Sequence, residues 1–195
     1  MAMNSAYLGL LALVAAGRLV ELRISRRNQR ALAAQGVPKI HEPHFRWMVL
    51  VHAGILGGAA LEVILLRRPL VPVLAISMGV VFLLANFLRW WVMRSLAGYW
   101  NVEVMASPRV GVVTSGPYRW IRHPNYVAVV AELFSLPMIH TAWITALAGT
   151  AANLEILRRR LQVEDGVLMA DPLYRASMGA KPRFLPRIFR SRPIS

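Results

Sequence analysis

The stretch VPVLAISMGVVFLLANFLRWWVM, residues 71–93, decides the fold, because it contains a single charged residue, Arg89, in 23 positions. A helix of about 20 apolar residues spans the ~30 Å hydrocarbon core of a bilayer. Trp90 and Trp91 near its end are typical of the aromatic belt at a membrane surface. The stretch therefore predicts a transmembrane helix.

Four further apolar runs occur in the chain, two before this stretch at residues 6–22 and 47–66 and two after it at residues 127–139 and 141–157. The chain is 56% hydrophobic and 16% charged, which is too apolar for a soluble domain. We expect one all-α integral membrane domain over residues 1–195, with about five transmembrane helices. The last two runs are short for a span and should form a helical hairpin turned at residues 137–141. A cleaved signal peptide is the alternative for the first run, but the uncharged start and the arginines that follow favour a membrane helix.

Arginine dominates the charge of the chain. There are 23 Lys and Arg residues against 9 Asp and Glu, a net charge of +14, and the arginines flank apolar segments. This pattern favours membrane lipids over nucleic acid as the partner. The arginines that follow the first run should stay in the cytoplasm, which places the N-terminus outside and the C-terminus in the cytoplasm. The excess of Arg over Lys is associated with bacteria of high genomic GC content, so we expect a bacterial inner (plasma) membrane.

Thiol and metal chemistry have little support in the sequence. The chain has no cysteine, which excludes disulfides, thiolate catalysis and Cys-based metal sites. The run His-Glu-Pro-His at residues 41–44 suggests metal ligands. However, Pro43 prevents a regular helix there and no further ligand cluster is near, so we expect a solvated loop and no metal site.

A polar stretch, TSGPYRWIRHPNY at residues 114–126, precedes the fourth apolar run. Pro124 has the place of a first-turn helix residue, so His123 or Arg122 falls at the helix mouth, beside backbone N–H groups that can hold an anion. Tyr118 and Tyr126 offer aromatic faces suited to a cation. We therefore expect a pocket for a zwitterionic ligand that opens at a membrane surface.

Polar residues also occur inside the predicted spans, close to their cytoplasmic ends: Arg18, His52, Arg89, Glu132 and Asn153. Such groups are costly in a membrane and usually face the bundle interior or a site. Glu132 either faces a substrate or pairs with an arginine, and the sequence leaves both alternatives open. Glu62 lies near the outer surface, where we expect it to pair with Arg67 or to snorkel.

Two separated blocks resemble the isoprenylcysteine carboxyl methyltransferase family. The first is Gly-Pro-Tyr at residues 116–118 followed by Arg-His-Pro-Asn-Tyr at residues 122–126. The second is Arg160 with Glu164, Asp165 and Leu168, followed by Tyr174 and the segment Arg-Phe-Leu-Pro at residues 183–186. The resemblance covers residues 94–186, and Asp165 replaces the second glutamate of the family's pair.

The resemblance implies S-adenosyl-L-methionine as the cofactor and a cofactor-binding half at residues 94–186. The apolar runs place three transmembrane helices before it, within residues 1–93, and a helical hairpin inside it at residues 126–157. Arg160 falls on a substrate-contacting position and lies on one helix face with Glu164. Arg160 and Glu132 are the expected catalytic residues. The positions that match the family's cofactor contacts are Val110, Gly111, Val112, Val113, Tyr118, His123, Pro124, Asn125, Tyr126 and Glu164.

The expected function is O-methylation of a lipophilic acceptor that enters from the bilayer. A carboxylate acceptor needs only to be oriented, whereas a hydroxyl would benefit from a base such as Glu132 or His52. The N-terminal half is similar to bacterial relatives associated with type III polyketide synthases, which implies long-chain alkylresorcinols or alkylpyrones; an isoprenylcysteine-like carboxylate is the alternative. A nicotinamide-dependent, sterol-reductase-like enzyme and a non-catalytic lipid-binding module also remain open, as does the oligomeric state.

Overall fold

The computed structural model describes residues 2–40, 42, 44–103 and 111–186, with the side chains of residues 2 and 3 left out. These residues form helices and no β-strand. The helices are α1 (Ala2–Ala34), α2 (Phe45–Leu65), α3 (Pro72–Leu96), α4 (Pro124–Met138), α5 (Trp143–Ala170) and α6 (Pro172–Met178), with short 3-10 turns η1 (Ala97–Tyr99) and η2 (Gly116–Arg119).

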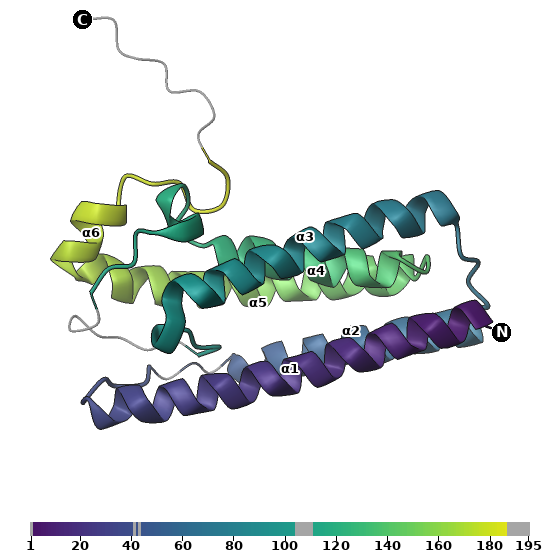
Figure 1. Ribbon diagram of the computed structural model, residues 1–195, viewed down its shortest axis with the longest axis horizontal. Coiled ribbons are helices and arrows are strands. Elements are labelled where there is room, and N and C mark those ends of the chain that lie inside the picture. Colours follow the sequence, from purple (N-terminus) through teal and green to yellow (C-terminus); the bar gives the residue numbers. More distant parts are fainter. Residues whose placement is uncertain (1, 41, 43, 104–110, 187–195) are drawn as a thin grey trace, which may run out of the picture.

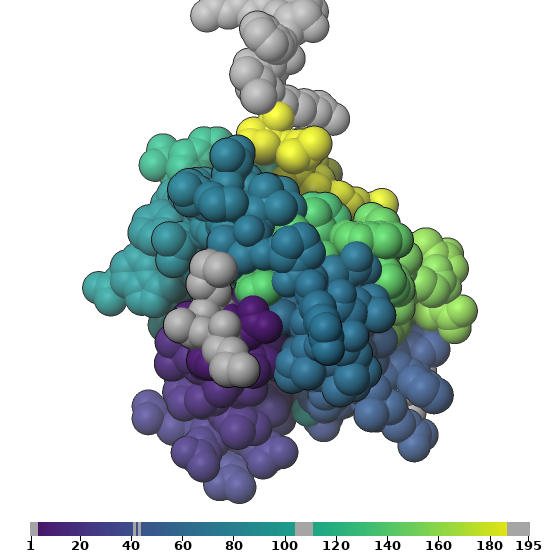
Figure 2. Space-filling model, turned by 90° about the vertical axis from the view of Figure 1, so that its right-hand side faces the viewer, coloured from purple at the N-terminus to yellow at the C-terminus, as the bar shows by residue number. Residues whose placement is uncertain are grey.

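The long helices pack side by side in an elongated bundle. In Figure 1, α1 and α2 run along one side, and α3, α4 and α5 lie against them. Figure 2 looks along the bundle from the end at which α1 begins, where its purple residues lie beneath the blue start of α3. The opposite end of the bundle holds α6, η2 and the extension of α5 (Figure 1).

Three helices are long and apolar enough to cross a membrane, over Asn4–Ala34, Phe45–Leu65 and Pro72–Tyr99. They cover the first three predicted runs to within one residue at the ends of the second and third, so the expectation of an all-α membrane protein is confirmed. Many large apolar side chains on these helices are exposed, among them Leu61, Ile76 and Leu83. Such an exterior suits contact with lipid chains.

The first helix is much longer than the apolar run that predicted it. It continues through the arginine-rich segment to Ala34 and ends where Gly36 adopts a φ of 76°. Side chains of this extension point inward: Ser25 is fully buried, and the Asn28 amide donates to the carbonyl of Trp100 at 2.8 Å. These tertiary contacts hold a polar segment helical beyond the apolar run.

Glu62 fixes the end of the bundle opposite α6. Its carboxylate accepts hydrogen bonds from the backbone N–H groups of Ile144 and Thr145 in the first turn of α5, at 3.2 and 2.8 Å. A carboxylate at a helix N-terminus satisfies free N–H groups and complements the helix dipole. The expected pairing with Arg67 is wrong: Arg67 takes a φ of 48° beyond the end of α2, and the ion pair is made by Arg68, at 2.8 Å.

The α4–α5 hairpin is held against α2 by close packing at Gly149. A Cβ built on Gly149 would lie 2.4 Å from Cγ1 of Ile55. Ile55 is 2% exposed and packs with Val129 and Leu133, so it has little room to move. The glycine therefore permits an approach of α5 to α2 that a larger residue would block.

We expect Gly149→Ala to destabilise the protein by about 1–3 kcal/mol, because the added methyl overpacks this contact. Gly57→Ala is the matched control on α2, since nothing lies within 4 Å of the Cβ it would gain. Alanine is the better helix former by roughly 1 kcal/mol, so the control should gain stability. Thermal unfolding in detergent measures both, and a stabilised Gly149→Ala protein would contradict the close packing.

Candidate functional site

The segment before α4 turns sharply against the end of α3. Gly116 has a φ of 58°, and a Cβ there would lie 2.1 Å from Oγ of Ser95, so only glycine fits without displacing a neighbour. The turn η2 then brings Tyr118 toward the bundle. Pro124 is the first residue of α4 and His123 its N-cap, as predicted, and no side chain caps this helix end.

The C-terminal segment is tied to this turn by backbone hydrogen bonds. The N–H groups of Arg122 and His123 donate to the carbonyls of Pro182 and Arg183, each at 2.9 Å. The His123 ring stacks on Tyr126, with 5.5 Å between ring centroids and an interplanar angle of 21°. The start of α4 is therefore fixed from two sides.

The part of α5 that extends beyond the apolar bundle continues the same unbroken helix and brings two consecutive carboxylates to the same place. Asp165 Oδ1 lies 2.8 Å from Nε2 of His123, and Asp165 Oδ2 lies 2.9 Å from Nε of Arg183. Glu164 accepts a hydrogen bond from the Tyr126 hydroxyl, and its Oε1 lies 3.7 Å from Nδ1 of His123. The two sequence blocks that resemble the methyltransferase family are thus in direct contact.

A first cavity of about 210 Å³ lies between these blocks and the end of α3. Eight of the expected cofactor-binding residues line it: Gly111, Val112, Val113, Tyr118, His123, Asn125, Tyr126 and Glu164. Pro124 does not line the cavity but is buried at the start of α4, and Val110 lies outside the described residues. The sequence motifs did not point to other lining residues, among them Leu32, Val92, Leu96, Trp100, Asn101 and Glu103.

Four buried polar atoms on residues that line the first cavity have no hydrogen-bond partner within the described part of the chain. Two are donors, Nε1 of Trp100 and Nε of Arg122, and two are the amide oxygens of Asn101 and Asn125. Buried polar groups are nearly always paired, so this set indicates a missing ligand or water. Together they offer both donors and acceptors to a small molecule.

Two tyrosine hydroxyls at the first cavity are kept neutral. Burial raises the pKa of Tyr174 to about 12, and the charge of Glu164 adds to the shift. Burial and the same carboxylate raise the pKa of Tyr118 well above its ordinary value. Both phenols therefore remain protonated at neutral pH and can act only as hydrogen-bond donors, neutral acceptors or aromatic faces.

A second cavity, of about 320 Å³, adjoins the first and lies deeper among the apolar helices. Trp100, Asn125, Tyr126 and Arg160 line both cavities and form a common wall. Most of the other lining residues are apolar, including Leu19, Phe45, Val49, Leu56 and Leu157. The polar residues are Arg18, Glu21, His52, Arg89 and Asn153.

Arg160 stands in the common wall and makes three contacts. Its Nε donates to the Tyr126 hydroxyl at 3.1 Å, and its Nη1 donates to the sulfur of Met48 at 3.1 Å. Its Nε also lies 3.4 Å from a carboxylate oxygen of Glu42. The structure thus brings Arg160 together with the expected cofactor-binding residues Tyr126 and Glu164.

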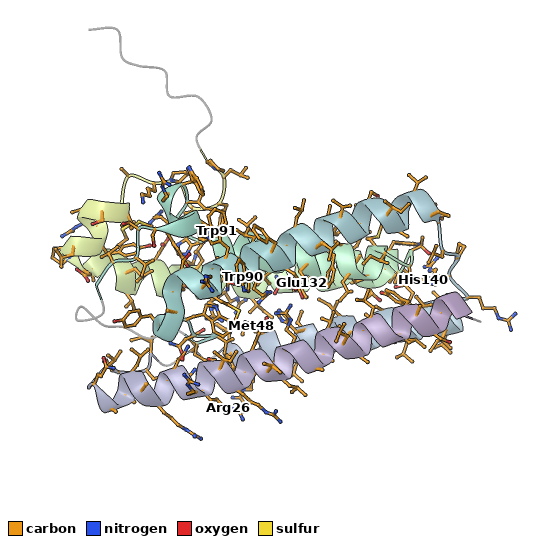
Figure 3. The ribbon with its side chains drawn as sticks, viewed as in Figure 1. Arg26, Met48, Trp90, Trp91, Glu132 and His140 are labelled. Carbon is orange, nitrogen blue, oxygen red and sulfur yellow. The ribbon has the colours of Figure 1, made fainter. Side chains whose placement is uncertain are left out.

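Glu132 belongs to a largely buried cluster of two arginines and two glutamates beside the second cavity. One carboxylate oxygen accepts from Arg18 and the other from Nη2 of Arg89, at 2.8 Å for the latter. Glu21 pairs with Arg18 and lies 3.5 Å from Nη1 of Arg89. Figure 3 shows Glu132 in the bundle interior, away from His140, which follows the end of α4. Glu132 is 2% exposed and lines neither cavity, so its contacts are those of an ion-pair partner.

No group of three His, Asp or Glu residues that could hold a metal ion occurs within residues 2–40, 42, 44–103 and 111–186. Of the His-Glu-Pro-His run, His41 and Pro43 lie outside these residues. Glu42 pairs with Arg160.

We expect Glu132→Gln to lower the free energy of unfolding by about 3 kcal/mol, because the buried Arg89 and the partly buried Arg18 lose a charge partner. Glu155→Gln is the control: it removes the same charge from α5, where Glu155 pairs with the exposed residues Arg158 and Arg159. Exposed pairs contribute little, so the control should melt like the unchanged protein. Equal melting of all three proteins in detergent would contradict a structural role for Glu132.

Comparisons with known proteins agree with the motif resemblance. A sequence profile described as the isoprenylcysteine carboxyl methyltransferase family matches residues 75–170, which run from α3 through the first block and the Arg160–Leu168 part of the second. The uncharacterized protein YpbQ of Bacillus subtilis is 30% identical over 160 residues, which cover 82% of this chain and 94% of that protein. An uncharacterized protein of Haemophilus influenzae is 25% identical over 158 residues, covering 80% of this chain and 91% of that protein.

Proposed function

The chain belongs to the isoprenylcysteine carboxyl methyltransferase family, and from this premise we propose that it is an S-adenosyl-L-methionine-dependent O-methyltransferase with a lipophilic, membrane-borne acceptor. Family membership supports a membrane methyltransferase; the cofactor, the chemistry and the acceptor are the proposal. The observation that carries it is the closure of the turn before α4 and the extension of α5 around one cavity with unpaired polar atoms.

The residues of the first cavity suit S-adenosyl-L-methionine, which combines a sulfonium cation, an amino-acid zwitterion and an adenosine. Tyr118 and Tyr126 would face the sulfonium or the adenine ring. Glu164 would accept from the ammonium group or the ribose hydroxyls, and Arg122 with the uncapped start of α4 would hold the carboxylate. The bound cofactor supplies a methyl group on a positively charged sulfur, which an oxygen nucleophile can attack.

The second cavity suits the acceptor, because it is mostly apolar and shares Tyr126 and Arg160 with the first. A long alkyl or prenyl chain would lie among the apolar side chains and place its polar head at the common wall. Arg160 would orient that head. Holding the two reactants in line supplies up to ~7–11 kcal/mol in favourable cases. The acceptor is a long-chain alkylresorcinol or alkylpyrone hydroxyl, or an isoprenylcysteine-like carboxylate.

The proposed topology has five spans, with α4 and the first half of α5 as a hairpin behind the three long helices. At 15 residues, α4 is roughly 22 Å long and would reach only part of the way across the bilayer. The end with α6 and the first cavity would face the cytoplasm of a bacterium, and the N-terminus would lie outside. On this arrangement residues 1–195 form one domain, with the cofactor-binding half at 94–186.

The test is calorimetric titration of the purified protein in detergent. S-adenosyl-L-methionine and its demethylated product should bind, and reduced nicotinamide dinucleotide phosphate should not. Glu164→Gln should weaken that binding by roughly 10–150-fold, the range for a lost hydrogen bond to a charged group. Glu155→Gln, the same change on the exposed face of α5, should bind like the unchanged protein.

Other outcomes identify the alternatives. Binding of the nicotinamide cofactor alone would point to a membrane reductase, and binding of neither molecule to a lipid-binding module. Transfer of label from the methyl donor to a membrane lipid extract, followed by identification of the product, would then name the acceptor.

A further inference from the structure

His52 lies on the face of α2 that lines the second cavity. Met48, His52 and Leu56 follow one another at intervals of four residues and all line it. Met48 contacts Arg160 in the common wall at 3.1 Å, so His52 lies one helical turn, about 6 Å of rise, deeper along the same face. An imidazole ring is therefore within side-chain reach of a head group held at the wall.

The hydrogen bond of His52 fixes which ring nitrogen is free. Nδ1 lies 2.7 Å from the carbonyl oxygen of Met48, and a carbonyl can only accept, so Nδ1 carries the hydrogen in the neutral ring. Nε2 then presents a lone pair. It has no hydrogen-bond partner among the described residues. A neutral imidazole with its outer nitrogen unpaired is the ordinary form of a general base.

The charges around the second cavity are already balanced. Arg18 and Arg89 pair with Glu21 and Glu132, and Arg160 pairs with Glu42. An acceptor carboxylate would either add an unbalanced negative charge to this cavity or displace a carboxylate from one of the arginines, and both are unfavourable in a low-dielectric interior. A neutral head group needs no such exchange. The cavity therefore favours an uncharged acceptor.

Glu132 is a poorer base than His52, although both were candidates. Both of its oxygens accept from arginines, and it does not line the cavity. The charged groups facing His52 from the neighbouring helices are Arg18 and Glu21 on α1, Arg89 on α3, Glu132 on α4 and Arg160 on α5.

We infer that His52 is the general base for a neutral hydroxyl acceptor of the phenol or enol class, an inference that rests on the proposed methyl transfer. The acceptor O–H bond breaks and its proton passes to Nε2 of His52. The oxygen keeps the electron pair and forms the new bond to the methyl carbon, while the carbon–sulfur bond of the donor breaks with its pair left on sulfur. The imidazolium then returns the proton to water.

The first test needs no methyl donor. A long-chain alkyl nitrophenol is bound to the purified protein, and its ionisation is followed by phenolate absorbance across a pH series. In the unchanged protein, the phenolate should form at least about one pH unit lower than in His52→Gln, which corresponds to a tenfold difference in the ionisation constant. His44→Gln makes the same substitution outside both cavities and should titrate like the unchanged protein. Identical titrations of the unchanged and His52→Gln proteins would overturn the inference.

The second test is turnover. His52→Gln should methylate a long-chain alkylphenol roughly 10²–10⁴-fold more slowly, the usual contribution of a general base. Its nitro derivative, assayed at a pH high enough to ionise the phenol without help, should be methylated less than about tenfold more slowly. Equal losses on the two acceptors, or faster methylation of a long-chain fatty acid by the unchanged protein, would overturn the inference.

Two further measurements keep the outcomes distinct. Retained binding of S-adenosyl-L-methionine by His52→Gln shows that this variant is folded. If it is not folded, the ¹⁵N resonances of His52 in the unchanged protein decide the question: protonation of both ring nitrogens when the nitrophenol binds supports the inference, and an unchanged neutral ring overturns it. Absence of cofactor binding by the unchanged protein would instead overturn the proposed function.

Discussion

The contact of His123 with the consecutive carboxylates Glu164 and Asp165 holds the functional end of the molecule together. It joins the start of α4 to the part of α5 that extends beyond the apolar bundle. Arg183, in the C-terminal segment, also pairs with Asp165 and so ties that segment to the same junction. Both cavities depend on this junction, because Tyr126, one turn into α4, is a wall of each. Asp165, which replaces the second glutamate of the family's pair, thus makes the structural contacts. Glu164, the residue before it, lines the first cavity.

The buried ion pairs impose a second constraint, deeper in the bundle. Glu132 on α4 binds arginines from α1 and α3, helices that are separated by many residues in the chain. Charges inside a membrane are tolerated only when they are paired, so these contacts favour one arrangement of the three helices over others with equally good apolar packing. The same cluster balances the charges at the polar part of the second cavity. An uncharged group can therefore bind there without leaving a charge unpaired.

Much of this architecture follows from sequence alone, and the exceptions have physical reasons. Apolar runs predicted the three long helices because length and hydropathy are local properties. The motif at residues 114–126 predicted Pro124 at the first turn of α4, since proline geometry is also local. The continuation of α1 to Ala34 was missed, because it depends on a hydrogen bond from Asn28 to the distant Trp100. Trp100 itself was missed for the same reason: nothing near it in the sequence marks a residue that borders two cavities, and the pairing of Glu42 with Arg160 is equally non-local.

The common wall between the two cavities determines how the two reactants reach each other. It consists of Trp100, Asn125, Tyr126 and Arg160. On the proposed function, the donor arrives from the aqueous phase and the acceptor from the lipid phase, and four side chains are the boundary at which they meet. Neither reactant has to pass through the compartment of the other, so either can load first. The two products separate in the same way: the spent donor returns to water, and the methylated lipid, which is less polar than the acceptor, returns to the bilayer.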